Sequence, residues 1–200
     1  MIYWAPLLHF YQPPTQLYSV LRKVCDECYR PLLQVFRQHP HARATVNIAG
    51  VLTELLWQHG FRDVVEGLRE LAAQGQIEFT GSARHHAILP LLPIEEVRRQ
   101  VRLNSIANRH YLGEAYRPRG FFPPELAYGP GLLGPVIDAH HEWVLVSGVA
   151  CPAAWPTSVV LEVQHGFDRL AVLFRDDVLS NRISFQQLDG RGFLEHLKAL

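Results

Sequence analysis

Residues 44–80 read ATVNIAGVLTELLWQHGFRDVVEGLRELAAQGQIEFT, a stretch in which two short β-type runs enclose two helical ones. The β-type runs are residues 44–48 and 77–80, and the helical runs are residues 50–59 and 61–74, divided by Gly60. A strand, a helical connection and a second strand are typical of a parallel βαβ unit. The stretch therefore predicts an α/β protein built on a parallel sheet.

The same alternation continues on both sides of this stretch. Strands are predicted over residues 2–9, 119–122 and 143–147, and a hairpin over residues 158–164 and 169–174. Helices are predicted over residues 17–38, with Pro31 kinking or splitting the helix, then 94–112, 130–141, 177–185 and 190–200, with Asp189 as a helix cap. With no break in composition along the way, we expect one domain.

Composition excludes several classes of protein. The 200 residues carry 19 basic and 19 acidic side chains, so no net charge favours nucleic acid or an anionic membrane as a partner. No apolar run approaches the roughly 18 residues of a membrane-spanning helix. Residues 1–14 lack the positively charged start of a signal peptide, and they contain His, Gln and two adjacent prolines. We expect a cytoplasmic enzyme.

The three cysteines indicate neither a disulfide framework nor a metal centre. Cys25 and Cys28 form a C-x-x-C pair inside the predicted helix, and Cys151 is distant in sequence. A structural zinc site needs four ligands, commonly from two such pairs, and a second pair is missing. We therefore expect helix packing for these residues, and neither a metal nor a cofactor.

Polar side chains gather where the predicted strands end. In chain order they are His9 and Gln12, Asn47, His85 and His86, Glu125, and Arg175 and Asp176. In a barrel of parallel strands, the carboxyl ends of the strands form the catalytic face. We expect His9, Gln12, His86, Glu125 and Arg175 to surround one cleft.

Several motifs, in this order, resemble glycoside hydrolase family 57. Residues 7–16, LLHFYQPPTQ, resemble the H-x-H-Q-P motif of that family, with Tyr11 in place of the second histidine. Residues 46–48 and 52–56 are similar to its second strand and helix. Residues 80–93, TGSARHHAILPLLP, resemble its Y-Y-H-P-I-L-P-L-L segment, so that His86 matches the family histidine. Residues 120–125, GFFPPE, fit G-x-W-x-x-E with Phe122 for Trp, and residues 174–185 resemble its F-R-D-x-x-L-S stretch.

The resemblance implies a (β/α)7-type parallel barrel and a retaining mechanism on α-glucans, as in an amylase or a branching enzyme. It assigns the nucleophile to Glu125. The general acid/base of the family belongs to a later D-G-E-like motif, which the chain lacks, because Asp189-Gly190 is not followed by Glu. We therefore expect residues 1–200 to be the N-terminal portion of the catalytic domain, with a barrel left incomplete because the chain ends before its last strand.

The residue chemistry assigns further roles. Retaining hydrolysis uses two carboxyls about 5–5.5 Å apart, one of them ionised to attack. Glu125 follows two prolines that restrict its backbone, although it could instead cap the following helix. His9, His86 and Gln12 could hydrogen-bond sugar hydroxyls, or be satisfied within the protein. Tyr11 and Phe122 could stack on sugars or pack in the core. Arg175 could hold a carboxylate or a hydroxyl, or pair with Asp176 or Asp177.

Two other classes of protein stay open. One is a metal-dependent hydrolase like a polysaccharide deacetylase, whose related barrel uses Asp and two His; here an early Asp pair is missing and the first strand ends in His9. The other is a non-catalytic, carbohydrate-binding remnant. A metal analysis would test the first alternative, and the gene sequence beyond Leu200 the second. Glucan linkage, substrate length, hydrolysis against transfer, and the oligomeric state are left open.

Overall fold

A computed structural model describes residues 4–152 and 159–199 of the chain. Its centre is a seven-stranded sheet in the order β1-β2-β3-β4-β5-β7-β6. The strands are β1 Leu7–Phe10, β2 Ala44–Ile48, β3 Ile77–Gly81, β4 Gly120–Phe121, β5 Trp143–Val146, β6 Leu161–His165 and β7 Asp168–Phe174. All neighbours pair in parallel except β6 and β7, which form an antiparallel hairpin. The predicted α/β fold with a parallel sheet is confirmed.

Each parallel strand pairs with the one before it, so the sheet winds in a single direction. Since strand–helix–strand crossovers are right-handed, such an order places the connecting helices on one face and lets the sheet curl toward a barrel. The described sheet is open: β1 and β6 are its two edges. This agrees with the predicted barrel-type sheet that does not close.

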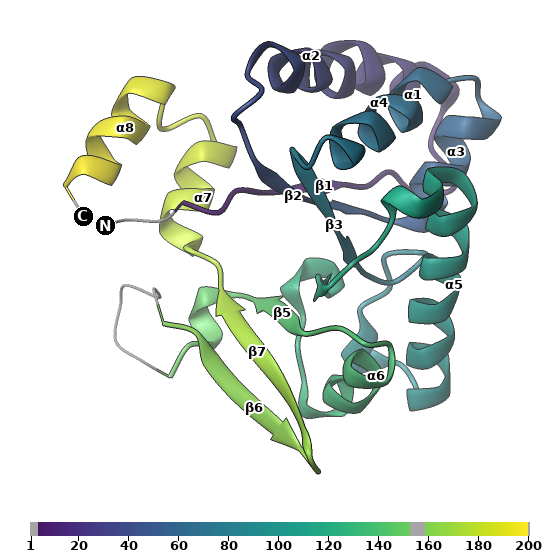
Figure 1. Cartoon of the computed structure of the whole chain (residues 1–200), viewed down its shortest axis with the longest axis vertical. Helices are drawn as coiled ribbons and strands as arrows, with labels where there is room; N and C mark the ends of the chain where they lie inside the picture. The colour runs from purple at the N-terminus through teal and green to yellow at the C-terminus, as the bar shows by residue number, and fades with distance from the viewer. Residues whose placement is uncertain (1–3, 153–158, 200) are drawn as a thin grey trace.

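The helices are α1 Tyr18–Val24, α2 Arg30–Gln38, α3 Gly50–Gln58, α4 Arg62–Ala73, α5 Ile94–Leu112, α6 Leu133–Asp138, α7 Asp177–Ser184 and α8 Gly190–Lys198. Short 3-10 turns lie at Leu89–Leu91, Gly113–Ala115, Pro124–Leu126, Pro130–Leu132 and Gly148–Ala150. Figure 1 shows α1 to α5 grouped along one side of the sheet, while the β6–β7 hairpin extends away from them. Among the described residues, none of the helices combines the length and apolar character needed to cross a membrane.

Two apolar clusters attach these helices to the sheet. Val46, Ile48 and Phe79 of β2 and β3 pack in the first cluster with residues of α1 to α4. Phe121 and Val144 of β4 and β5 pack in the second cluster with residues of α5 and α6. Since side chains alternate along a strand, the residues between these positions, such as Asn47 and Thr80, lie on the opposite, inner face of the sheet.

The predicted helix over residues 17–38 is continuous but changes its winding. A π turn, Cys25–Tyr29, joins α1 to α2 just before Pro31. Proline has no N–H to complete an α-type hydrogen bond, and a locally wider turn accommodates it. Cys25 of the C-x-x-C pair is buried and Cys28 is exposed, both as free thiols.

Several predicted boundaries were wrong by a few residues. The first strand begins after Pro6 instead of at residue 2; residues 1–3 lie outside the described part, as do residue 158 of the hairpin and residue 200 of the last helix. The helix predicted over residues 130–141 is a 3-10 turn followed by α6, which ends at Asp138. His140 has a left-handed backbone, φ 61°, which a helix cannot include.

Candidate active site

The inner face of the sheet carries a cluster of polar and aromatic side chains at the carboxyl ends of β1 to β4. Its members are His9, Tyr11, Asn47, Thr80, His86, Phe122 and Glu125. His9 and Asn47 are direct register partners on β1 and β2. We call this group the histidine cluster. Its position is the one that barrel enzymes use for catalysis.

Two hydrogen bonds and one longer contact connect the cluster from its interior to its surface. The Nδ1 of His9 lies 2.7 Å from Oδ1 of Asn47, and its Nε2 lies 3.0 Å from Nε2 of His86. The Nδ1 of His86 then lies 3.8 Å from Oε1 of Glu125. The His86 side chain is 7% exposed and that of Glu125 is 67% exposed. A carboxylate open to a ligand therefore has a nearly buried imidazole behind it.

Aromatic rings hold the two histidines in place. Tyr11 stacks on His86 with ring centroids 4.0 Å apart, and Phe122 stacks on His9 at 5.0 Å. Phe122 is buried, so most of its surface is already used by the protein. Its predicted contact with a sugar, and that of Tyr11, stay predictions.

The surroundings favour neutral histidines. Loss of water around the rings lowers the pKa of His9 and of His86, against the smaller opposing effect of Glu125. His9 is exposed on the open inner face, although the rings of His86, Tyr11 and Phe122 surround it on the other sides. The loss of water is therefore more complete around His86, whose side chain is 7% exposed. The same loss of water raises the pKa of the Tyr11 hydroxyl.

Glu125 sits in a strained backbone. It follows Pro123 and Pro124, and both Glu125 (φ 57°, ψ 17°) and Leu126 (φ 53°) are left-handed. His86 has φ 57° as well. Non-glycine residues in this region cost roughly 1–3 kcal/mol each and are concentrated at functional sites. The Glu125 side chain is exposed, and the N-cap residues of the following 3-10 turn and of α6 are Gly129 and Leu132, which argues against the alternative that Glu125 merely caps a helix.

This strain predicts a separation of stability from function at residue 125. Glu125→Gly is expected to raise the free energy of unfolding by about 1 kcal/mol, because glycine adopts this backbone freely and the lost side chain is exposed. Glu125→Ala, the matched control, retains the strain and is expected to give no such gain. Urea denaturation of the three proteins measures the difference, and equal stability of the two variants would contradict the strain.

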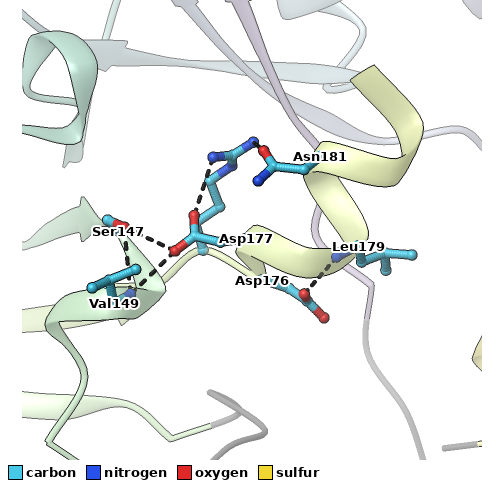
Figure 2. A network of polar contacts seen from close by, with 7 residues as sticks. Ser147, Val149, Asp176, Asp177, Leu179 and Asn181 are labelled. Atoms are coloured by element: carbon cyan, nitrogen blue, oxygen red, sulfur yellow. Dashed lines mark hydrogen bonds and ion pairs between the residues drawn. The ribbon is translucent and has the colours of Figure 1, made fainter. Parts of the chain in front are cut away.

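Two predicted site residues make their hydrogen bonds with residues outside the histidine cluster. Gln12 accepts a hydrogen bond from the Gln16 amide at 2.6 Å. Arg175 donates to Asp177 at 3.1 Å and to Asn181 at 3.0 Å. Figure 2 shows Asp177 at the centre of this second network, where it also accepts from the Ser147 hydroxyl and the Val149 backbone. Arg175 thus makes the ion pair with Asp177 that the sequence had left open.

Asn47 and Thr80 join the site, although the sequence pattern predicted no specific role for either. Asn47 and Thr80 are fully buried, and the Asn47 amide donates to the Thr80 hydroxyl at 2.9 Å. The available signal was an asparagine inside an otherwise apolar strand. Within residues 4–152 and 159–199, no three or more His, Cys, Asp or Glu side chains are grouped so as to hold a metal ion.

Comparison with known proteins assigns the chain to a class of enzyme. The sequence model of glycosyl hydrolase family 57 matches residues 7–199. The chain therefore belongs to glycosyl hydrolase family 57.

Individual relatives are much longer than this chain. Alpha-amylase 1 of Dictyoglomus thermophilum is 28% identical over 146 residues, which are 72% of this chain and 21% of that protein. The crystal structure of 4-alpha-glucanotransferase from Thermococcus litoralis superposes with a TM-score of 0.84 at 22% identity, over 98% of this chain and 31% of that one. The structure of a polysaccharide deacetylase from Mycobacterium smegmatis, described as putative, has a TM-score of 0.61 at 15% identity, over 88% of this chain and 59% of that one. The last two show likeness of fold alone.

Proposed function

We propose that residues 1–200 form the N-terminal portion of the catalytic domain of a retaining α-glucan hydrolase or glucanotransferase, with Glu125 as its nucleophile. The observation that carries the proposal is the exposed Glu125 carboxylate at the end of β4, 3.8 Å from the nearly buried His86. Family membership and relatives named as an amylase and a glucanotransferase support α-glucans as the substrate class. Cytoplasmic location stays a prediction.

A retaining mechanism also needs a general acid/base about 5–5.5 Å from the nucleophile. The aspartates late in the chain have other partners. Asp176 and Asp189 cap α7 and α8 by accepting from the backbone N–H groups of Leu179 and Gly192. Asp177 is held by Ser147 and Arg175. We therefore assign the general acid/base to a part of the protein outside these 200 residues.

The rest of the histidine cluster suits a sugar in front of Glu125. The Nδ1 of His86 can accept a hydrogen bond from a sugar hydroxyl, and the ring of Tyr11 offers an apolar face. Both nitrogens of His9 already bond to Asn47 and His86, which favours a supporting role for His9 over direct contact with substrate. The pairing of Arg175 with Asp177 favours a supporting role for Arg175 over direct contact with substrate.

The proposal predicts a trapped intermediate. An activated α-glucosyl fluoride has a leaving group that needs no proton, so it can glycosylate Glu125 without the general acid. The missing residue also serves as the base for the second step, so the adduct is expected to persist. Intact-protein mass spectrometry should show the addition of one glucosyl unit, and peptide mapping should locate it on Glu125.

Two variants make this test specific. Glu125→Gln is expected to abolish the adduct, whereas Glu78→Gln, which alters a glutamate on the neighbouring β3, should retain it. An adduct on another carboxylate would overturn the assignment of the nucleophile. Binding of oligosaccharide without any adduct would favour a carbohydrate-binding remnant. Stoichiometric metal in the purified protein, together with release of acetate from an acetylated sugar, would favour the deacetylase alternative.

A further inference from the structure

A chain of hydrogen bonds begins at fully buried groups and ends beside Glu125. The Asn47 amide nitrogen donates to the Thr80 hydroxyl at 2.9 Å, and its oxygen lies 2.7 Å from Nδ1 of His9. The Nε2 atoms of His9 and His86 are 3.0 Å apart. Asn47 is 0% exposed, so it cannot reach a substrate. Any influence of Asn47 on the reaction must therefore pass through His9.

The donor and the acceptor of each hydrogen bond in this series can be assigned from the chemistry of the groups. An amide oxygen only accepts, so Nδ1 of His9 must carry the hydrogen. A neutral imidazole has one N–H, which leaves Nε2 of His9 as an acceptor. The Nε2 of His86 must then donate, and the other nitrogen of a neutral His86 carries no hydrogen.

We propose that Asn47 is a positioning residue that fixes the tautomers of His9 and His86, so that His86 presents an unprotonated Nδ1 to Glu125. A proton gained by His86 then enters at the nitrogen that faces the carboxylate, 3.8 Å away. The groups packed around the pair are Asn47, Tyr11, Phe122 and Glu125, of which only Glu125 is charged at neutral pH. The use of this arrangement in catalysis rests on the proposed function, but the tautomers themselves do not.

The nearly buried position of the His86 side chain and the rings packed around His9 favour the neutral state of both histidines. Desolvation is the largest effect on both histidines and lowers the pKa of each. Neutral Nδ1 of His86 can accept a proton or a hydroxyl hydrogen bond close to the attacking oxygen. When Glu125 gives up its charge to form a covalent bond, a neutral neighbour also avoids holding that charge in place by ion pairing.

Two-bond nitrogen–proton correlation spectra of the nitrogen-15-labelled protein test the tautomers directly at about pH 7.5. Assignment by His9→Gln and His86→Gln identifies the two signals among the 11 histidines. The expected result is the Nδ1–H tautomer for His9 and the Nε2–H tautomer for His86. The opposite pair of tautomers, or a cationic His86 at this pH, would overturn the proposal without any variant of Asn47.

Variants of Asn47 test its part in the arrangement. Asn47→Leu is expected to abolish the Nδ1–H signature of His9, because no acceptor remains. Asn47→Asp is expected to retain that tautomer and to raise the pKa of His9, because a carboxylate oxygen accepts the same hydrogen and adds charge. Asn108→Leu is the matched control: Asn108 is also fully buried but bonds to Thr53 and the Ile48 carbonyl. Retention of the His9 tautomer in Asn47→Leu would overturn the role of Asn47.

The fluoride experiment distinguishes this inference from the proposed function. Expected tautomers with no adduct on Glu125 would refute the nucleophile and retain the positioning role of Asn47. Reversed tautomers with an adduct on Glu125 would refute the positioning role of Asn47 and retain Glu125 as the nucleophile. If Asn47→Leu does not fold, the spectra of the unaltered protein and of Asn47→Asp still decide the proposal.

Discussion

Gly120→Ala is expected to lower the free energy of unfolding by about 3 kcal/mol, because the space above Gly120 is filled by a tryptophan. A Cβ on Gly120 would lie 2.0 Å from Cζ2 of Trp143 and 2.1 Å from Cε2. The two residues are register partners on β4 and β5. The indole ring of Trp143 must therefore move to admit the methyl group.

Gly131→Ala is the matched control, since a Cβ there meets nothing within 4 Å and its backbone is not left-handed. Its effect is expected to stay within about 0.5 kcal/mol. Urea denaturation measures both variants. In a Trp143→Leu background the cost of Gly120→Ala should fall sharply, as a double-mutant cycle would show. Equal stability of Gly120→Ala and Gly131→Ala would contradict this account of the motif glycine.

Acidification from about pH 7.5 to about 4.5 is expected to remove about 2–3 kcal/mol of stability through His141 alone. His141 is 8% exposed, and its Nδ1 has no hydrogen-bond partner among the described residues. Burial lowers its pKa from 6.5 to about 4. In the unfolded chain His141 therefore binds a proton below about pH 6.5, whereas in the folded chain it binds one only below about pH 4. The free energy of unfolding consequently falls between these two pH values and is constant below them.

The measurement is the free energy of unfolding against pH for the unaltered protein and for His141→Phe. The phenylalanine fills similar space beside Phe121 and Gly81 but has no proton to gain. Acid loss shared by both proteins comes from other groups, including His9 and His86, whose pKa values are also lowered. Parallel curves for the two proteins would show that His141 is not the group responsible.

Local sequence carried most of the information about the fold. The β-type runs at residues 44–48 and 77–80 and the helical runs between them predicted a parallel unit, because side-chain periodicity depends only on the chain itself. The polar residues at the predicted strand ends indicated a common location, because the carboxyl ends of parallel strands lie on the same side of a sheet. That this location is catalytic stays a prediction. Boundaries were less accurate where a turn depends on distant contacts or on a left-handed residue, as at His140.

By itself, then, the sequence determined the parallel α/β architecture, the family and the identity of the residues that gather at the ends of the strands. Tertiary structure alone decided which of them meet. His9, His86 and Glu125 come together because β1, β3 and β4 lie in one sheet, whereas Arg175 bonds to Asp177 and Asn181. The role of Asn47 depends on its pairing with His9 across two strands, 38 residues apart in sequence. This contact follows from the pairing of β1 with β2, which brings together two segments that are distant in the sequence.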